Sequence, residues 1–139
     1  MTARARTELG LFLKFGLVGG GGFLVDALVL QAGLALGLEP PVARAVSVVV
    51  AMHATFLVND ALVFRQHRVR PLPARWAGYL AANSLGAACN YLVFLGLTGS
   101  GVPVLSQPLA ALAVGSVIGW GVNYTGSRML AYRSRAAAD

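Results

Sequence analysis

The sequence predicts an all-α membrane protein with four transmembrane helices. Three observations predict this fold class: the composition, four long apolar segments, and a one-sided distribution of basic residues. Hydrophobic residues make up 57% of the 139 residues and charged residues only 12%. A soluble domain carries about 25% charged residues, because its surface faces water. The mean hydropathy of +0.69 therefore indicates a chain that is surrounded by lipid.

Each apolar segment is long enough to cross a bilayer, which takes about 20 apolar residues for roughly 30 Å of hydrocarbon. We expect the spans at residues 9–36, 42–64, 76–97 and 104–130. Segments 37–41 and 99–103 are rich in glycine and proline, which predicts tight turns. Residues 1–139 therefore form a single transmembrane domain.

The basic residues fix the expected orientation of these spans. Only Arg44 falls on one side of the membrane under this assignment. Basic residues in short loops stay in the cytoplasm, so both termini and the loop at 65–75 are predicted to be cytoplasmic. The ten basic residues on that side are Arg4, Arg6, Lys14, Arg65, Arg68, Arg70, Arg75, Arg128, Arg133 and Arg135.

Several function classes are not expected for this chain. The net charge of +6 follows from topology rather than from a basic face with stacking aromatic residues, so nucleic acid is not an expected partner. The single cysteine, Cys89, excludes an intramolecular disulfide, and no Cys/His spacing typical of a metal site occurs. No nucleophile–base pair or nucleotide-binding loop is present, so neither an enzyme nor a cofactor is predicted.

The two halves of the chain resemble each other, with repeat units at 9–65 and 73–133. The first span aligns with the third at an offset of 64, and the second with the fourth at an offset of 68. Each unit is a helical hairpin, so both units enter the membrane in the same direction, as parallel repeats do. The matched pairs are Phe12/Trp76, Phe15/Tyr79, Gly22/Gly86, Asp26/Asn90, Ala43/Ala111, Phe56/Tyr124, Phe64/Tyr132 and Arg65/Arg133.

Polar side chains within the spans are candidates for function. A carboxylate near mid-membrane, as Asp26 is, costs about 2.5–3.5 kcal/mol on insertion scales and needs a partner, a water-filled cavity or a proton. Asn83, Asn90 and Asn123 share helical faces with small residues, which typically meet inside a bundle. Structural pairing and a role in handling a substrate both remain open for these four residues.

The second span carries two further candidates, His53 and Asp60, on one helical face. A membrane histidine either packs with a hydrogen bond or relays protons, and the sequence leaves both open. The repeat aligns Asp60 with Arg128 at matching depth. We therefore hypothesise an Asp60–Arg128 ion pair across the pseudo-twofold axis.

Three motifs resemble the GtrA-like family of small four-helix membrane proteins. They are Phe12-Leu-Lys-Phe15-Gly-Leu-Val-Gly19 in the first span, Phe56-Leu-Val-Asn59-Asp60-Ala-Leu-Val-Phe64 in the second, and Asn123-Tyr-Thr-Gly-Ser-Arg128-Met-Leu-Ala-Tyr132 in the fourth. The family's second span typically ends with Asn-Arg-x-x-x-Phe, whereas this chain has Asp60 in place of the basic residue. A phosphate-binding role is therefore not transferred to position 60.

The resemblance implies a multi-pass protein of the bacterial inner membrane that acts in cell-surface polysaccharide synthesis. It implies a flippase for polyprenyl-phosphate-linked sugars, working beside a membrane glycosyltransferase. Cationic side chains such as Lys14 and Arg128 are then expected to attract the phosphate, and Arg44 either receives it on the outer side or snorkels to the interface. A polar lane for the sugar is expected from Asp26, Asn59, Asn83, Asn90 and Asn123.

Four short helices enclose little volume, because packed helix axes lie about 8–10 Å apart. We therefore expect either a lateral groove that is open to membrane lipids or a path between the protomers of a homodimer. Two other functions remain open. The first is a non-transporting scaffold that recruits a glycosyltransferase through the loop at 65–75. The second is a proton-coupled exporter of small molecules, which would depend on a pH gradient.

Overall fold

The computed structural model describes the backbone of residues 3–62 and 71–136, and the side chains of residues 19–61 and 71–125. This part of the chain folds into four α-helices and contains no strand. The helices are α1 (Ala3–Ala35), α2 (Pro40–Leu62), α3 (Leu72–Thr98) and α4 (Pro108–Ala136). The prediction of an all-α fold with four helices is therefore confirmed.

Glycine and proline set the helix ends. Gly37 and Gly101 have φ values of +83° and +71°, which side-chain-bearing residues rarely adopt, and each lies in a turn. Pro108 opens α4, as proline commonly does at the first helical position, where no N–H is needed. The fourth helix therefore begins at Pro108 and not at Val104 as expected, since Val104 lies in the turn that precedes it.

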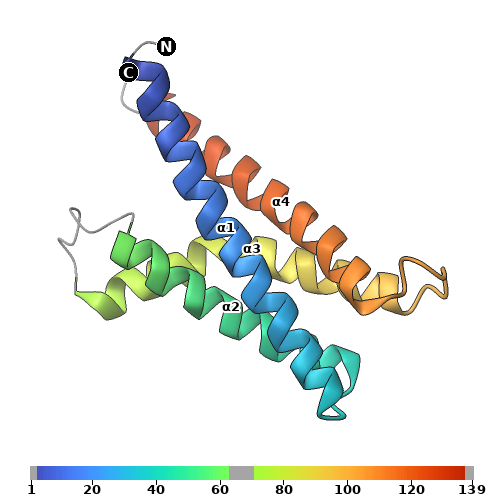
Figure 1. The fold of residues 1–139 in the computed structure, drawn as a ribbon. Coiled ribbons are helices and arrows are strands. Elements are labelled where there is room, and N and C mark those ends of the chain that lie inside the picture. Colours follow the sequence, from blue (N-terminus) through green and yellow to red (C-terminus); the bar gives the residue numbers. More distant parts are fainter. Residues whose placement is uncertain (1–2, 63–70, 137–139) are drawn as a thin grey trace.

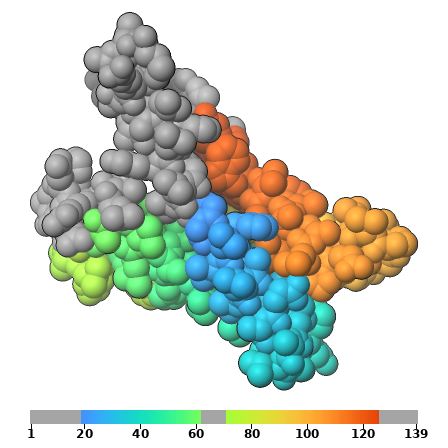
Figure 2. Space-filling model, in the orientation of Figure 1, coloured from blue at the N-terminus to red at the C-terminus, as the bar shows by residue number. Residues whose placement is uncertain are grey.

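The helices pair as two hairpins, α1 with α2 and α3 with α4, and the hairpins pack together mainly through α2 and α3. Figure 1 shows the end of α2 and the start of α3 at the left, the α1–α2 turn at the bottom and the α3–α4 connection at the right. Figure 2 shows residues 19–35 of α1 at the centre of one face, between α2 and α4. All four helices therefore contribute to one interior.

A small apolar core lies toward the two turns. It consists of Leu30, Ala43, Phe94, Ala111 and Leu112, each 0% exposed. The repeat alignment pairs Leu30 with Phe94 and Ala43 with Ala111, so equivalent positions of the two hairpins meet at this core. The core anchors all four helices at one end of the bundle.

The outer surface of the helices is apolar. Among the described side chains, Pro40–Ala61 and Leu72–Thr98 are long and apolar enough to cross a membrane, and Gly19–Ala35 is a shorter apolar helix. Only 28% and 11% of the two longer spans are buried, whereas a core helix of a soluble protein would be mostly buried. Lipid is the environment that accommodates such exposed apolar side chains.

Candidate functional site

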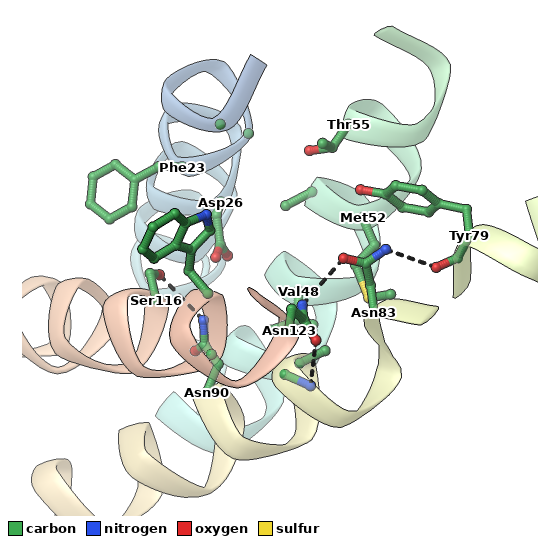
Figure 3. A pocket seen from close by; sticks show the side chains of 17 residues that line it. Phe23, Asp26, Val48, Met52, Thr55, Tyr79, Asn83, Asn90, Ser116 and Asn123 are labelled. Carbon is green, nitrogen blue, oxygen red and sulfur yellow. Dashed lines mark hydrogen bonds between the residues drawn. The ribbon is translucent and has the colours of Figure 1, made fainter. Parts of the chain in front are cut away.

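A crevice of about 240 Å³ that several polar side chains line lies between the four helices and is the main candidate site (Figure 3). We call it the central crevice. Its lining combines small residues, which leave space, with amides, hydroxyls and one carboxylate. The lining residues are Gly19, Gly22, Phe23, Asp26, Val48, Ala51, Met52, Thr55, Tyr79, Asn83, Gly86, Ala87, Asn90, Ser116, Gly119, Trp120 and Asn123.

The central crevice has a closed end and an open rim. On each helix the apolar core lies nearer the turn than the polar lining does: Leu30 is one helical turn beyond Asp26, and Phe94 is one turn beyond Asn90. The core therefore closes the crevice toward the turns. Phe23 and Trp120 are 40% and 58% exposed and line its rim. The crevice is thus bordered by apolar aromatic rings and holds polar side chains among small and apolar ones.

The most strongly bonded part of the site is an ion pair between Asp26 of α1 and Arg44 of α2. Arg44 Nη1 donates to Asp26 Oδ1 at 2.5 Å and to Ser47 Oγ at 2.9 Å, and Nη2 donates to Asn90 Oδ1 at 2.6 Å. The Phe94 ring lies 5.4 Å from the guanidinium carbon. Arg44 is 0% exposed, so this cation lies inside the bundle. We call this group the Arg44 cluster.

Asparagines hold α3 and α4 together. Asn123 Oδ1 accepts a hydrogen bond from the Gly86 backbone N–H at 3.0 Å, and Asn123 Nδ2 donates to Asn83 Oδ1 at 3.2 Å. Asn90 Nδ2 donates to Ser116 Oγ at 3.3 Å. Figure 3 shows these amides converging on the central crevice. The three predicted asparagines thus line one cavity and also bridge helices.

In both hairpins a glycine packs directly against the partner helix at the same aligned positions. A Cβ on Gly22 would meet Thr55 Oγ1 at 2.5 Å, and a Cβ on Gly86 would overlap the Asn123 amide. Gly22 aligns with Gly86 at the offset of 64, and Thr55 aligns with Asn123 at the offset of 68. The structure therefore repeats a glycine against a hydrogen-bonding side chain in each half.

His53 and Asn59 lie outside the lining of the central crevice. His53 Nδ1 lies 2.7 Å from the Val49 carbonyl oxygen, and its ring centroid is 5.3 Å from that of Trp76. Together with Phe56, Leu57, Leu72 and Pro73, these two rings line a separate, largely apolar groove between α2 and α3. The Asn59 side chain hydrogen-bonds Tyr79, which does line the crevice. His53 is thus packed against an aromatic ring, and Asn59 reaches the crevice through a neighbour.

Asp60 forms an ion pair with Arg75 at the start of α3, and their side chains are 11% and 19% exposed. The hypothesised partner Arg128 lies outside the side chains that the structure describes, and so does Lys14. The Asp60–Arg128 pair therefore stays a prediction. The contact with Arg75 joins the two hairpins where α2 ends and α3 begins.

Sequence reasoning did not select Thr55, Tyr79 and Ser116, which also line the central crevice. The internal repeat contained a signal for Thr55, because it aligns with Asn123, which was selected. The Arg44 cluster was missed because Arg44 was assigned to the outer side of the membrane. Among the described residues no group of three or more His, Cys, Asp or Glu side chains lies close enough to hold a metal ion.

Two comparisons with known proteins bear on this architecture. A search of curated proteins found no match. The family model described as GtrA/DPMS, transmembrane domain, matches residues 14–132, which include the whole central crevice, the Arg44 cluster and the apolar core. The match covers most of the 139 residues, and it agrees with the resemblance carried by the three motifs. The chain is a membrane protein that belongs to the GtrA/DPMS transmembrane-domain family.

Proposed function

We propose that this protein translocates polyprenyl-phosphate-linked sugars across the bacterial inner membrane for cell-surface polysaccharide synthesis. The observation that carries the proposal is the central crevice, an open space between four helices that holds amide, hydroxyl and carboxylate groups, while the outer faces of the helices are apolar. A lipid-linked sugar has the same division: its polyprenyl tail is soluble in lipid, whereas its sugar and phosphate are not.

The lining of the crevice is suited to a sugar. Asn83, Asn90 and Asn123 offer amide donors and acceptors, and Asp26 offers a carboxylate acceptor. A volume of about 240 Å³ equals that of roughly eight waters at about 30 Å³ each. This space accepts a small polar head group, while the tail stays in the lipid outside Phe23 and Trp120.

The proposed orientation places both termini and the loop between α2 and α3 in the cytoplasm, following the basic residues. The apolar core then closes the crevice toward the outer leaflet. Under this orientation the structure corresponds to a state that receives substrate from the cytoplasmic leaflet. Release on the other side requires the two hairpins to separate at the core, as repeats do in alternating access.

Translocation by purified protein in liposomes tests the proposal. An impermeant reagent modifies only those lipid-linked sugars that face outward. Without translocation the modification stops at the outward-facing fraction, and with translocation it approaches completion. We expect completion with the wild type and slower completion with Asp26→Asn. Ser84→Ala is the matched control, because this exposed hydroxyl bonds only to the Ala81 carbonyl of its own helix.

If the modified fraction of lipid-linked sugar stayed at the outward-facing plateau although folded protein was present, translocation would be contradicted. It would instead favour a scaffold that recruits a membrane glycosyltransferase, and co-purification of that enzyme would then be measured. The exporter would be favoured if the protein transported small solutes at a rate that depends on an imposed pH gradient and did not translocate lipid-linked sugar. Crosslinking in native membranes distinguishes a monomeric crevice from a homodimer.

A further inference from the structure

We propose that the Arg44 guanidinium is an oxyanion site, occupied by Asp26 in this structure and by a phosphodiester when substrate enters. The inference rests on the proposed function and assigns the two charged parts of the site: Arg44 takes the phosphate, and the displaced Asp26 carboxylate accepts hydroxyls of the sugar. Each step follows from the contacts of the Arg44 cluster.

The hydrogen-bonding capacity of Arg44 is only partly used. A guanidinium presents five N–H donors in a planar fork, and Arg44 bonds three acceptors, on Asp26, Ser47 and Asn90. Its Nε is buried and has no hydrogen-bond partner among the described residues. A buried donor without an acceptor is destabilising, so this site gains from an additional oxygen.

Asp26 is an incomplete partner for this fork. Arg44 bonds Asp26 through Oδ1, whereas arginine binds carboxylate and phosphate most strongly through two parallel N–H···O bonds. A phosphodiester has two free oxygens and a single negative charge. A phosphodiester therefore matches the charge of the carboxylate that it displaces from Arg44 and offers the second oxygen that a two-bond contact with the guanidinium requires.

The position of the pair allows this exchange. Arg44 is fully buried behind Asp26 and Asn90, and both of these residues line the central crevice. A ligand in the crevice therefore reaches the acceptors of Arg44 first. The other described groups packed against this pair are uncharged: Ser47 on α2, Asn90 and Phe94 on α3, and Ser116, which bonds Asn90, on α4. Asp26 is thus the anion that an incoming phosphate must replace.

Binding of methyl citronellyl phosphate, a short prenyl phosphodiester without a sugar, tests the exchange. The protein is placed in nanodiscs of zwitterionic lipid, and affinity is measured by calorimetry. We expect the wild type to bind this probe and not citronellol, which lacks the phosphate. Arg44→Gln should weaken binding by at least about tenfold, the loss of one charge-assisted contact. Asp26→Asn should tighten binding by on the order of tenfold, because the competing anion is gone.

Two variants make the outcome specific. Arg44→Lys keeps the cation but loses the fork, and we expect it to bind the probe several-fold more weakly than the wild type; it replaces Arg44→Gln if that variant does not fold. Ser84→Ala should bind as the wild type does. Weaker binding by Asp26→Asn, or unchanged binding by Arg44→Gln, would overturn the exchange. Equal binding by Arg44→Lys and the wild type would overturn the role of the fork.

Other phosphates distinguish the source of the ligand. Inorganic phosphate should compete weakly, and phosphatidylglycerol added to the nanodiscs should not compete. Competition by phosphatidylglycerol equal to that of the probe would overturn the assignment to lipid-linked sugars. The binding assay needs no translocation: liposomes that fail to translocate while the binding pattern holds would remove the proposed function and leave the oxyanion site. If the protein translocates the lipid-linked sugar but Asp26→Asn does not bind the probe more tightly, only the proposed exchange of Asp26 for the phosphate is contradicted.

Discussion

The Gly86 backbone N–H of α3 donates to the Asn123 side chain of α4 at 3.0 Å, in the interior of the second hairpin. The contact requires glycine, because a Cβ at position 86 would overlap the Asn123 amide. In the first hairpin Gly22 packs against Thr55 at the aligned positions, where a Cβ would likewise overlap the side chain. Close approach of backbones is a principal means of helix association in lipid, where burial of apolar surface adds little.

Replacing Gly119 by alanine should loosen the second hairpin. A Cβ there would lie 2.6 Å from the Gly86 carbonyl oxygen, whereas a Cβ on Gly121 meets nothing within 4 Å. We expect Gly119→Ala to cost about 1–3 kcal/mol, as overpacking does, and Gly121→Ala to be neutral. Thermal unfolding in detergent, followed by circular dichroism, measures both. Equal midpoints for the two variants would show that α3 and α4 do not depend on this approach.

Truncating Asn123 should weaken both structure and transport. Asn123→Ala removes the bonds to Gly86 and Asn83, and interhelical hydrogen bonds in membranes contribute about 0.6 kcal/mol each on average. We expect a stability loss of roughly 1–2 kcal/mol and slower translocation in liposomes. Thr125→Ala serves as the control, because this exposed hydroxyl bonds the Gly121 carbonyl of its own helix. An Asn123→Ala protein that translocates like the control would remove this amide from the path.

The Asp26–Arg44 pair should be more costly to break than to replace. Removing one partner of a buried ion pair costs about 3–5 kcal/mol, whereas replacing both by apolar residues is often neutral. We expect Asp26→Leu and Arg44→Met each to unfold at lower temperature than the Asp26→Leu/Arg44→Met protein. The double variant should fold yet lose binding of the phosphodiester probe. If the stability lost by the double variant equalled the sum of the losses of the two single variants, the two side chains would not be directly coupled.

Asp60 and Arg75 should behave as a coupled pair between the two hairpins. After Asp60→Ala, the further change Arg75→Ala should have less effect on unfolding than it has in the wild type, because the interaction is already lost. A double-mutant cycle measures this coupling. The same cycle with Arg128→Ala tests the hypothesised pair across the pseudo-twofold axis. Strictly additive losses in either cycle would exclude that pair.

Cysteine labelling tests the proposed orientation. In a Cys89→Ser background, we expect Glu39→Cys and Ser100→Cys to react with an impermeant maleimide added to intact cells. Both residues are exposed in the turns. Ala74→Cys, exposed near the start of α3, should react only after the membrane is permeabilised. The reverse pattern would invert the topology and direct the closed end of the crevice toward the cytoplasm.

Much of the fold was predictable because it depends on properties of short segments. Long apolar runs become helices in lipid, since the backbone must satisfy its own hydrogen bonds there, and glycine and proline end them. The predicted spans therefore agree within a few residues with both ends of α2 and α3 and with the end of α1. The fourth helix starts later than predicted, because Pro108 and not Val104 opens it, and α1 and α4 extend beyond the predicted spans toward the two termini. The repeat offsets also align the residues that make equivalent contacts in the two hairpins, Gly22 with Gly86 and Thr55 with Asn123.

The sequence by itself determined that the chain forms four helices for a membrane, that its halves are related, and which polar residues lie within the spans. Only the tertiary structure decided how those residues pair. Arg44 lies one helical turn into α2, and its sequence position predicted a place near the outer surface. Because α1 packs antiparallel to α2, the Arg44 side chain instead bonds Asp26, 18 residues away in the sequence. Apolar length is a local property, whereas the partner of a charge depends on how each helix is rotated and crossed against its neighbours.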